Sequence, residues 1–93
     1  MTVATLRLDL RIGGCHSARE KRRRMQTIMT KLRKHFNISV AATDMDGEPS
    51  GISFLFAAAG SGRREVFEIL ERITEALAVY PGAELLSHAI SEV

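Results

Sequence analysis

The chain has 93 residues, 45% hydrophobic and 26% charged, a composition typical of one globular domain spanning residues 1–93. No apolar run approaches the roughly 18 residues that a membrane helix requires. We therefore expect no contact with a membrane. The single cysteine excludes an internal disulfide, so we expect a cytoplasmic protein. Residues 1–37 carry ten Lys and Arg against two carboxylates, whereas residues 38–93 carry three against nine. This division favours contact with an anionic partner, or pairing between the two halves.

Apolar and polar residues alternate from Ala4 to Ile12, the period of a strand with one buried face. Two glycines end this strand. Ser17 and Glu20 then form the pattern of a capping box, in which each side chain satisfies a backbone N–H group of the other residue. A helix is predicted from Ser17 to about Phe36, and we expect Asn37 to close it in the left-handed conformation. Its buried face is predicted to consist of Met25, Ile28, Met29, Leu32 and Phe36.

The second half of the chain contains three more strands and a second helix. A second strand is predicted over 38–43, a loop over 44–51, and a third strand over 52–59 that is apolar on both faces and therefore central. Gly60–Gly62 introduces the second helix, and Pro81-Gly82 ends it. The buried face of this helix is predicted to be Val66, Ile69, Leu70, Ile73, Leu77 and Tyr80. The fourth strand, 83–93, has adjacent leucines at 85 and 86, which leave its inward face open.

The order β-α-β-β-α-β predicts an α+β fold of the ferredoxin-like type. Both helices then cover one face of a four-stranded antiparallel sheet. The opposite face has no aromatic platform, so we do not expect RNA bases to stack on it. Its small apolar residues predict a homodimer through Arg7, Asp9, Leu55 and Ala57, with pairing of an edge strand as the alternative.

The first helix carries most of the positive charge of the chain. A turn of about 100° per residue places Arg23, Thr27, Thr30 and Lys34 opposite Met25. Lysine and arginine at such positions neutralise phosphates without reading sequence. The residues predicted to contact nucleic acid are Arg19, Arg23, Arg24, Lys31 and Lys34. The alternative is that these cations meet water or pair with the acidic stripe of the second helix: Glu68, Glu71 and Glu75.

A second candidate site lies where the first loop enters this helix. Free N–H groups, a glycine loop and a nearby ammonium are typical of a small-anion site, here Gly13, Gly14, Ser17 and Lys21. The alternative is that Lys21 lays its methylene groups over the sheet edge.

Catalytic and metal sites are not expected in this chain. Cys15 and His16 could pair as thiolate and base, but adjacent residues at a turn usually point apart and no third group orients them. The histidines at 16, 35 and 88 lack the spacing of metal ligands, so no metal or cofactor is expected.

Three segments, 6–23, 32–41 and 66–73, carry a likeness to a known family. The string LRLDLRI-GG followed by SAREKRR, then LRKHFNISVA and V-x-E-I-L-E-R-I, resembles the YlxP-like family of small bacterial proteins over nearly the whole chain. The resemblance implies a ferredoxin-like fold, no established activity, and genes placed among those of translation and ribosome maturation. We therefore expect a non-enzymatic accessory protein that contacts RNA or a ribosomal surface. The alternative is a self-associating domain that binds a small anion or metabolite at the 13–21 loop.

Overall fold

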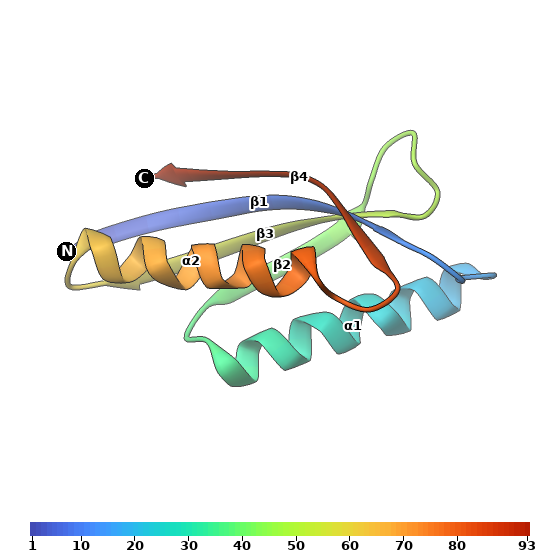
Figure 1. Cartoon of the computed structure of the whole chain (residues 1–93), viewed down its shortest axis with the longest axis horizontal. Helices are drawn as coiled ribbons and strands as arrows, with labels where there is room; N and C mark the ends of the chain where they lie inside the picture. The colour runs from blue at the N-terminus through green and yellow to red at the C-terminus, as the bar shows by residue number, and fades with distance from the viewer.

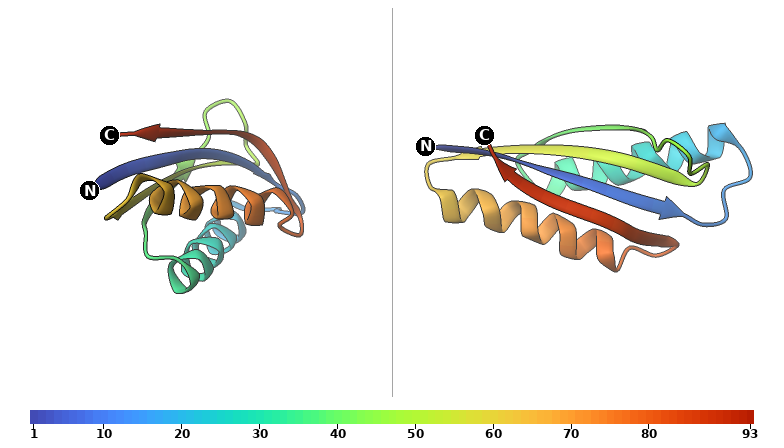
Figure 2. Two further views of the ribbon diagram at one scale, coloured as in Figure 1. Left: turned by 60° about the vertical axis from the view of Figure 1, so that its left-hand side comes forward. Right: turned by 90° about the horizontal axis from the view of Figure 1, so that it is seen from above.

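The computed structural model describes all 93 residues. Its elements are β1 (Thr2–Ile12), α1 (Ala18–His35), β2 (Ser39–Asp44), β3 (Gly51–Gly60), α2 (Arg63–Ala78) and β4 (Ala83–Glu92). The strands form one antiparallel sheet in the order β2-β3-β1-β4. Both helices lie on the same side of this sheet (Figure 1), and the molecule therefore has two layers (Figure 2). This arrangement confirms the ferredoxin-like α+β fold. Neither helix is long and apolar enough to cross a membrane.

The core lies between the sheet and the helices, and the two central strands supply most of it. The predicted alternation of β1 is confirmed, because every inward residue from Ala4 to Ile12 is at most 1% exposed. In β3 the rings of Phe54 and Phe56 stack on the inward side with centroids 5.7 Å apart. The buried residues of α2 cover both strands: Val66, Leu70, Ile73 and Leu77. β3 lies between β2 and β1, so its predicted central position is confirmed.

The two helices cover different parts of the sheet. α2 packs on β1, β3 and β4, whereas α1 packs on the edge strand β2. From α1, Ile28 and Leu32 enter the core, and Met25 and Met29 are half-buried against it. Most of the surface of α1 therefore faces solvent.

The end of α1 differs from the prediction. Phe36 is the C-cap residue in an extended conformation, and its N–H group donates to Leu32 O at 2.9 Å. No residue other than glycine has a positive φ, so the prediction of a left-handed conformation at Asn37 was wrong. The chain instead leaves the helix already extended, in the conformation that β2 requires.

A β-bulge decides the inward face of β4. Asp9 pairs with Ser87 and Leu10 pairs with Leu85, which leaves Leu86 as the extra residue. The bulge reverses the alternation at this point, so Leu85 before it and Ile90 after it both pack against the core.

Candidate functional site

Local interactions fix the start of α1. The Ser17 hydroxyl accepts a hydrogen bond from the N–H group of Glu20 at 3.1 Å, as the capping box predicts. The return bond, however, comes from the N–H group of His16, 3.4 Å from Glu20 Oε2, one residue before the predicted donor. At the other end, the basic residues of the last turn lie where the helix dipole favours positive charge.

The exposed face of α1 is rotated from its predicted position. The fully buried residues of the helix are Lys21, Ile28 and Leu32, and their mean direction lies about 40° from Met25. The direction pointing away from the protein therefore rotates by the same angle. Seven exposed residues lie within about 60° of this direction. The hydroxyl of one of them, Thr27, is bonded to Arg23 O, and we call the other six the outer stripe: Arg19, Arg23, Gln26, Thr30, Arg33 and Lys34.

The structure divides the five residues predicted to contact nucleic acid. Arg19, Arg23 and Lys34 lie on the outer stripe, whereas Arg24 and Lys31 lie on the flank that faces the turn between α2 and β4. Arg33, which was not among the five, belongs to the outer stripe. A helical wheel centred on Ile28 and Leu32 instead of Met25 would have included it.

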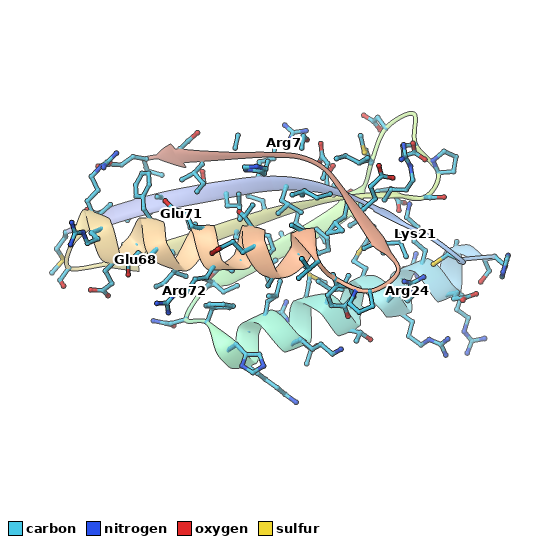
Figure 3. All side chains as sticks on the ribbon, in the orientation of Figure 1. Arg7, Lys21, Arg24, Glu68, Glu71 and Arg72 are labelled. Carbon is cyan, nitrogen blue, oxygen red and sulfur yellow. The ribbon has the colours of Figure 1, made fainter.

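The two flank residues make contacts within the protein. The guanidinium of Arg24 donates to the carbonyl oxygens of Gly13 and Gly82, and its label in Figure 3 lies beside the α2–β4 turn. Lys31 Nζ lies 3.4 Å from Tyr80 Oη and 5.5 Å from the centroid of that ring. Arg24 therefore fastens the first loop and the later turn to α1.

The positive charge of α1 is not neutralised within the chain. The helix contains eight Lys and Arg and one Glu, yet only Lys21 among these cations forms an ion pair. None of the four ion pairs joins α1 to α2, so the predicted alternative of pairing between the helices is not observed. Glu68 and Glu71 of α2 are labelled in Figure 3 away from α1.

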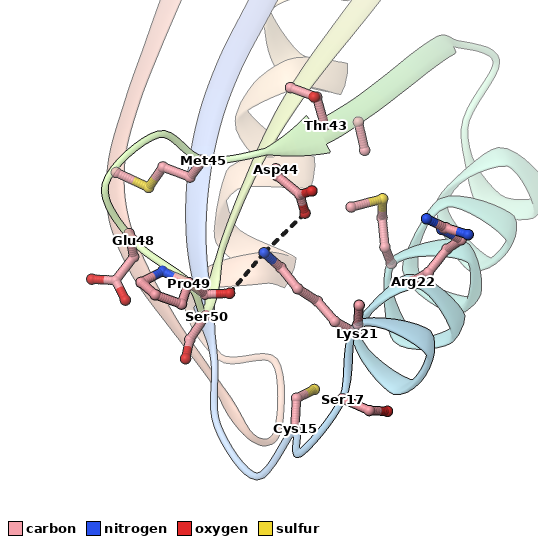
Figure 4. Close-up of a pocket in the computed structure, with 13 residues that line it drawn as sticks. Cys15, Ser17, Lys21, Arg22, Thr43, Asp44, Met45, Glu48, Pro49 and Ser50 are labelled. Carbon is pink, nitrogen blue, oxygen red and sulfur yellow. Dashed lines mark hydrogen bonds and ion pairs between the residues drawn. The ribbon is translucent and has the colours of Figure 1, made fainter.

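A groove of about 610 Å³ lies between the first turns of α1 and the β2–β3 loop (Figure 4). Lys21 extends along it and is only 9% exposed. Its ammonium lies 3.0 Å from Asp44 Oδ1 and donates to the carbonyl oxygen of Pro49 at 2.8 Å. Lys21 is therefore buried between α1 and the β2–β3 loop, and its charge is already paired with a carboxylate.

The residues of the predicted anion site make separate contacts and do not converge on one point. The N–H group of Gly13 donates to Gly82 O at 2.9 Å, and the Ser17 hydroxyl caps α1. Gly14 has φ +74°, which explains why a glycine stands there. Lys21 extends toward the β2–β3 loop, away from these residues (Figure 4).

The groove contains a thiol whose polar contact is with a guanidinium. Cys15 Sγ lies 3.4 Å from the guanidinium of Arg24, and no hydrogen bond joins Cys15 to His16. No three His, Cys, Asp or Glu side chains gather where they could hold a metal ion.

The open face of the sheet places the predicted dimer residues on two neighbouring strands. Arg7 pairs with Leu55 across β1 and β3, and Leu55 is 50% exposed. The carboxylate of Asp9 accepts hydrogen bonds from Ser53 at 2.7 Å and Ser87 at 3.0 Å, and thereby bridges three strands. Because Asp9 is bonded within its own sheet, Arg7 is the unpaired charge of this face.

The end of the same face carries a short ion-pair network. Arg11 lies 2.9 Å from Glu48 of the β2–β3 loop and 2.7 Å from Glu84 of β4. The hydrogen bond from Arg11 holds the pKa of Glu48 below its ordinary value, and the two carboxylates raise the pKa of Arg11. The network joins the β2–β3 loop, which lies beside the groove, to β1 and β4.

The fold and this surface define a small ferredoxin-like domain whose positive charge is concentrated on one exposed helix. Residues 3–90 match DUF503, a family described as a protein of unknown function. The chain belongs to this family. No curated protein matches the chain. Among solved structures, protein YJCS from structural genomics is similar with a TM-score of 0.59 and 10% identity, covering 98% of each chain. At that identity the likeness concerns the fold alone.

Proposed function

We propose that this chain is a YlxP-like accessory protein of translation or ribosome maturation. It acts without catalysis in the cytoplasm and contacts RNA, or an RNA-bearing ribosomal surface, through α1. The observation that carries the proposal is the unneutralised positive charge of the outer stripe. Four of its six residues are cations, and none of them forms an ion pair.

Burial and charge together favour a macromolecular anion over a small one. The outer stripe runs from Arg19 to Lys34, a length of about 22 Å at 1.5 Å per residue. Its six residues are exposed and spread along the helix, so together they can follow several phosphates. Contacts of this kind release counterions and give affinity without sequence specificity.

The alternative, a small anion or metabolite bound at the 13–21 loop, has weaker support. An anion in the groove must approach Lys21 against the carboxylate of Asp44, 3.0 Å from its ammonium. Like charges at such a distance oppose binding. The other two charged residues of the lining, Arg22 and Glu48, are of opposite sign, so the groove carries no net positive charge that would attract an anion.

The proposal is tested by RNA binding measured over a range of salt concentrations. We expect Arg23→Glu/Arg33→Glu/Lys34→Glu to abolish most of the affinity and to reduce the slope of log K against log salt by about 2 or more. The matched control reverses all three cations of α2, Arg63→Glu/Arg64→Glu/Arg72→Glu, and thus produces the same net charge. Equal loss in both variants would show that only net charge matters and would remove α1 as the contact surface.

A native pull-down with and without nuclease tests the cellular partner. Partners that are lost after nuclease treatment support RNA as the link. Partners that persist after nuclease, and also persist with the α1 triple variant, would contradict the proposal.

A further inference from the structure

The cations of the outer stripe are divided between its two ends. Arg19 and Arg23 occupy the N-terminal end, and Arg33 and Lys34 occupy the C-terminal end. The midpoints of the two pairs lie 12 to 13 residues apart, which is about 19 Å along the helix. The cations of the outer stripe therefore form two separate pairs, one at each end, and not a continuous line of charge.

The middle of the outer stripe is polar and uncharged. Gln26 and Thr30 are exposed there, and neither side chain forms a hydrogen bond with the rest of the protein. Both offer a donor and an acceptor. By contrast, the hydroxyl of the neighbouring Thr27 is used within the helix, since it donates to Arg23 O at 3.0 Å. The two free side chains are also shorter than the cations on either side of them.

No aromatic side chain is available to stack on bases beside these residues. None of the five aromatic residues of the chain is fully exposed. Phe54 and Phe56 are buried, and Arg63 covers the ring of Phe67 at 4.3 Å from its centroid. Proteins that bind single strands rely on such stacking platforms. The outer stripe therefore fits a base-paired helix better than an unpaired strand.

We propose that α1 binds double-stranded A-form RNA across its minor groove; this inference rests on the proposed function. The two cationic ends contact phosphates of the opposite strands, and Gln26 and Thr30 contact 2′-hydroxyl groups between them. The minor groove of A-form RNA is wide and shallow and displays these hydroxyls at its surface. A 2′-hydroxyl is both donor and acceptor, which matches the chemistry of both side chains.

B-form DNA lacks the hydroxyl groups that the middle of the outer stripe could contact. Its major groove is wide enough to admit an α-helix, but both of its grooves display base edges and no 2′-hydroxyl. DNA therefore offers α1 the phosphate contacts but not the contacts proposed for Gln26 and Thr30.

The experiment compares the full chain on three probes at one fixed salt concentration: a duplex RNA, one of its single strands, and the duplex DNA of the same sequence. We expect the duplex RNA to bind most tightly. Gln26→Ala/Thr30→Ala should reduce the preference for duplex RNA over DNA by about tenfold, the worth of two hydrogen bonds. Affinity for DNA and the salt slope should stay unchanged. Alanine favours the helix, so the fold is kept. Thr27→Ala is the matched control, because its hydroxyl is already used.

The outcomes separate this inference from the proposed function. Equal affinity for all three probes, or tighter binding of the single strand, overturns the duplex inference while RNA binding by α1 survives. A preference for duplex RNA that the Gln26→Ala/Thr30→Ala variant leaves unchanged also overturns it. No binding to any probe at low salt defeats the proposed function itself.

Discussion

The contacts of Lys21 in the groove predict that this side chain stabilises the fold by tethering α1 to the β2–β3 loop. Lys21→Met keeps most of the buried apolar stem and removes the ammonium. The lost interactions are the hydrogen bond to Pro49 O at 2.8 Å and the ion pair with Asp44, whose side chain is 81% exposed. A hydrogen bond from a charged group contributes about 1.5 kcal/mol at the low end, and an exposed ion pair less than about 1 kcal/mol.

We therefore expect Lys21→Met to lower the free energy of unfolding by about 1.5 to 2 kcal/mol and the Tm by roughly 6 to 16 °C for a domain of this size. Urea unfolding followed by circular dichroism measures the change. Asp44→Asn should cost less than about 0.5 kcal/mol, because the exposed carboxylate is already hydrated. Lys34→Met is the control, an exposed lysine on the same helix with no ion pair.

Equal stability of Lys21→Met and Lys34→Met would refute the tether. If Lys21→Met were fully stable and also lost binding of inorganic phosphate, Lys21 would be an anion ligand, and the alternative function at the 13–21 loop would gain support.

Three further predictions concern the N-cap of α1, the stability of the protein at low pH and the open face of the sheet. Ser17→Ala should lower the free energy of unfolding by about 1 kcal/mol, since it removes the acceptor for the N–H group of Glu20; urea unfolding shows whether the cap contributes. Arg11 lowers the pKa of Glu48, so the folded state binds that proton less tightly than the unfolded state. This contribution is complete above the ordinary glutamate pKa of about 4.3 and is lost as the pH falls through the lowered value. Glu48→Gln should therefore flatten the fall in Tm on acidification, and parallel slopes for both proteins would contradict this. We also propose that the open face forms a homodimer that Leu55→Arg dissociates; light scattering at micromolar concentration decides this, and a monomeric wild type would disprove it.

Much of the fold could be predicted from the sequence because its patterns are local. The alternation of β1 and the capping residue Ser17 each depend on neighbours a few positions away. The inward face of β4 could not be predicted, because Leu85 and Leu86 are equally apolar. Only the pairing of β4 with β1 shows that Leu86 is the bulged residue.

The basic helix was predicted from the sequence, but the direction of its exposed face was not. A helical wheel gives the angle between any two residues of a helix. It shows which residues face solvent only when the centre of the buried face is known. Met25 is only half-buried, so the wheel centred on it was rotated. The role of Arg24 was beyond any local pattern, because its partner Gly82 lies 58 positions along the chain.

The strand order β2-β3-β1-β4 has a consequence for how this chain folds during its synthesis. The strand made first, β1, lies in the centre and pairs with β3 and β4 but never with β2. When α1 and β2 have been made, no sheet can yet exist. Contacts between segments so distant in sequence make folding slow, because a large loop must close before they form. At that stage the nascent chain carries the ten cations of residues 1–37, while eight of the nine carboxylates of residues 38–93 have not yet been made. The growing chain is thus strongly cationic until the β2–β3 loop and α2 have been made, because these two segments supply six of the nine carboxylates that bring the net charge to +2.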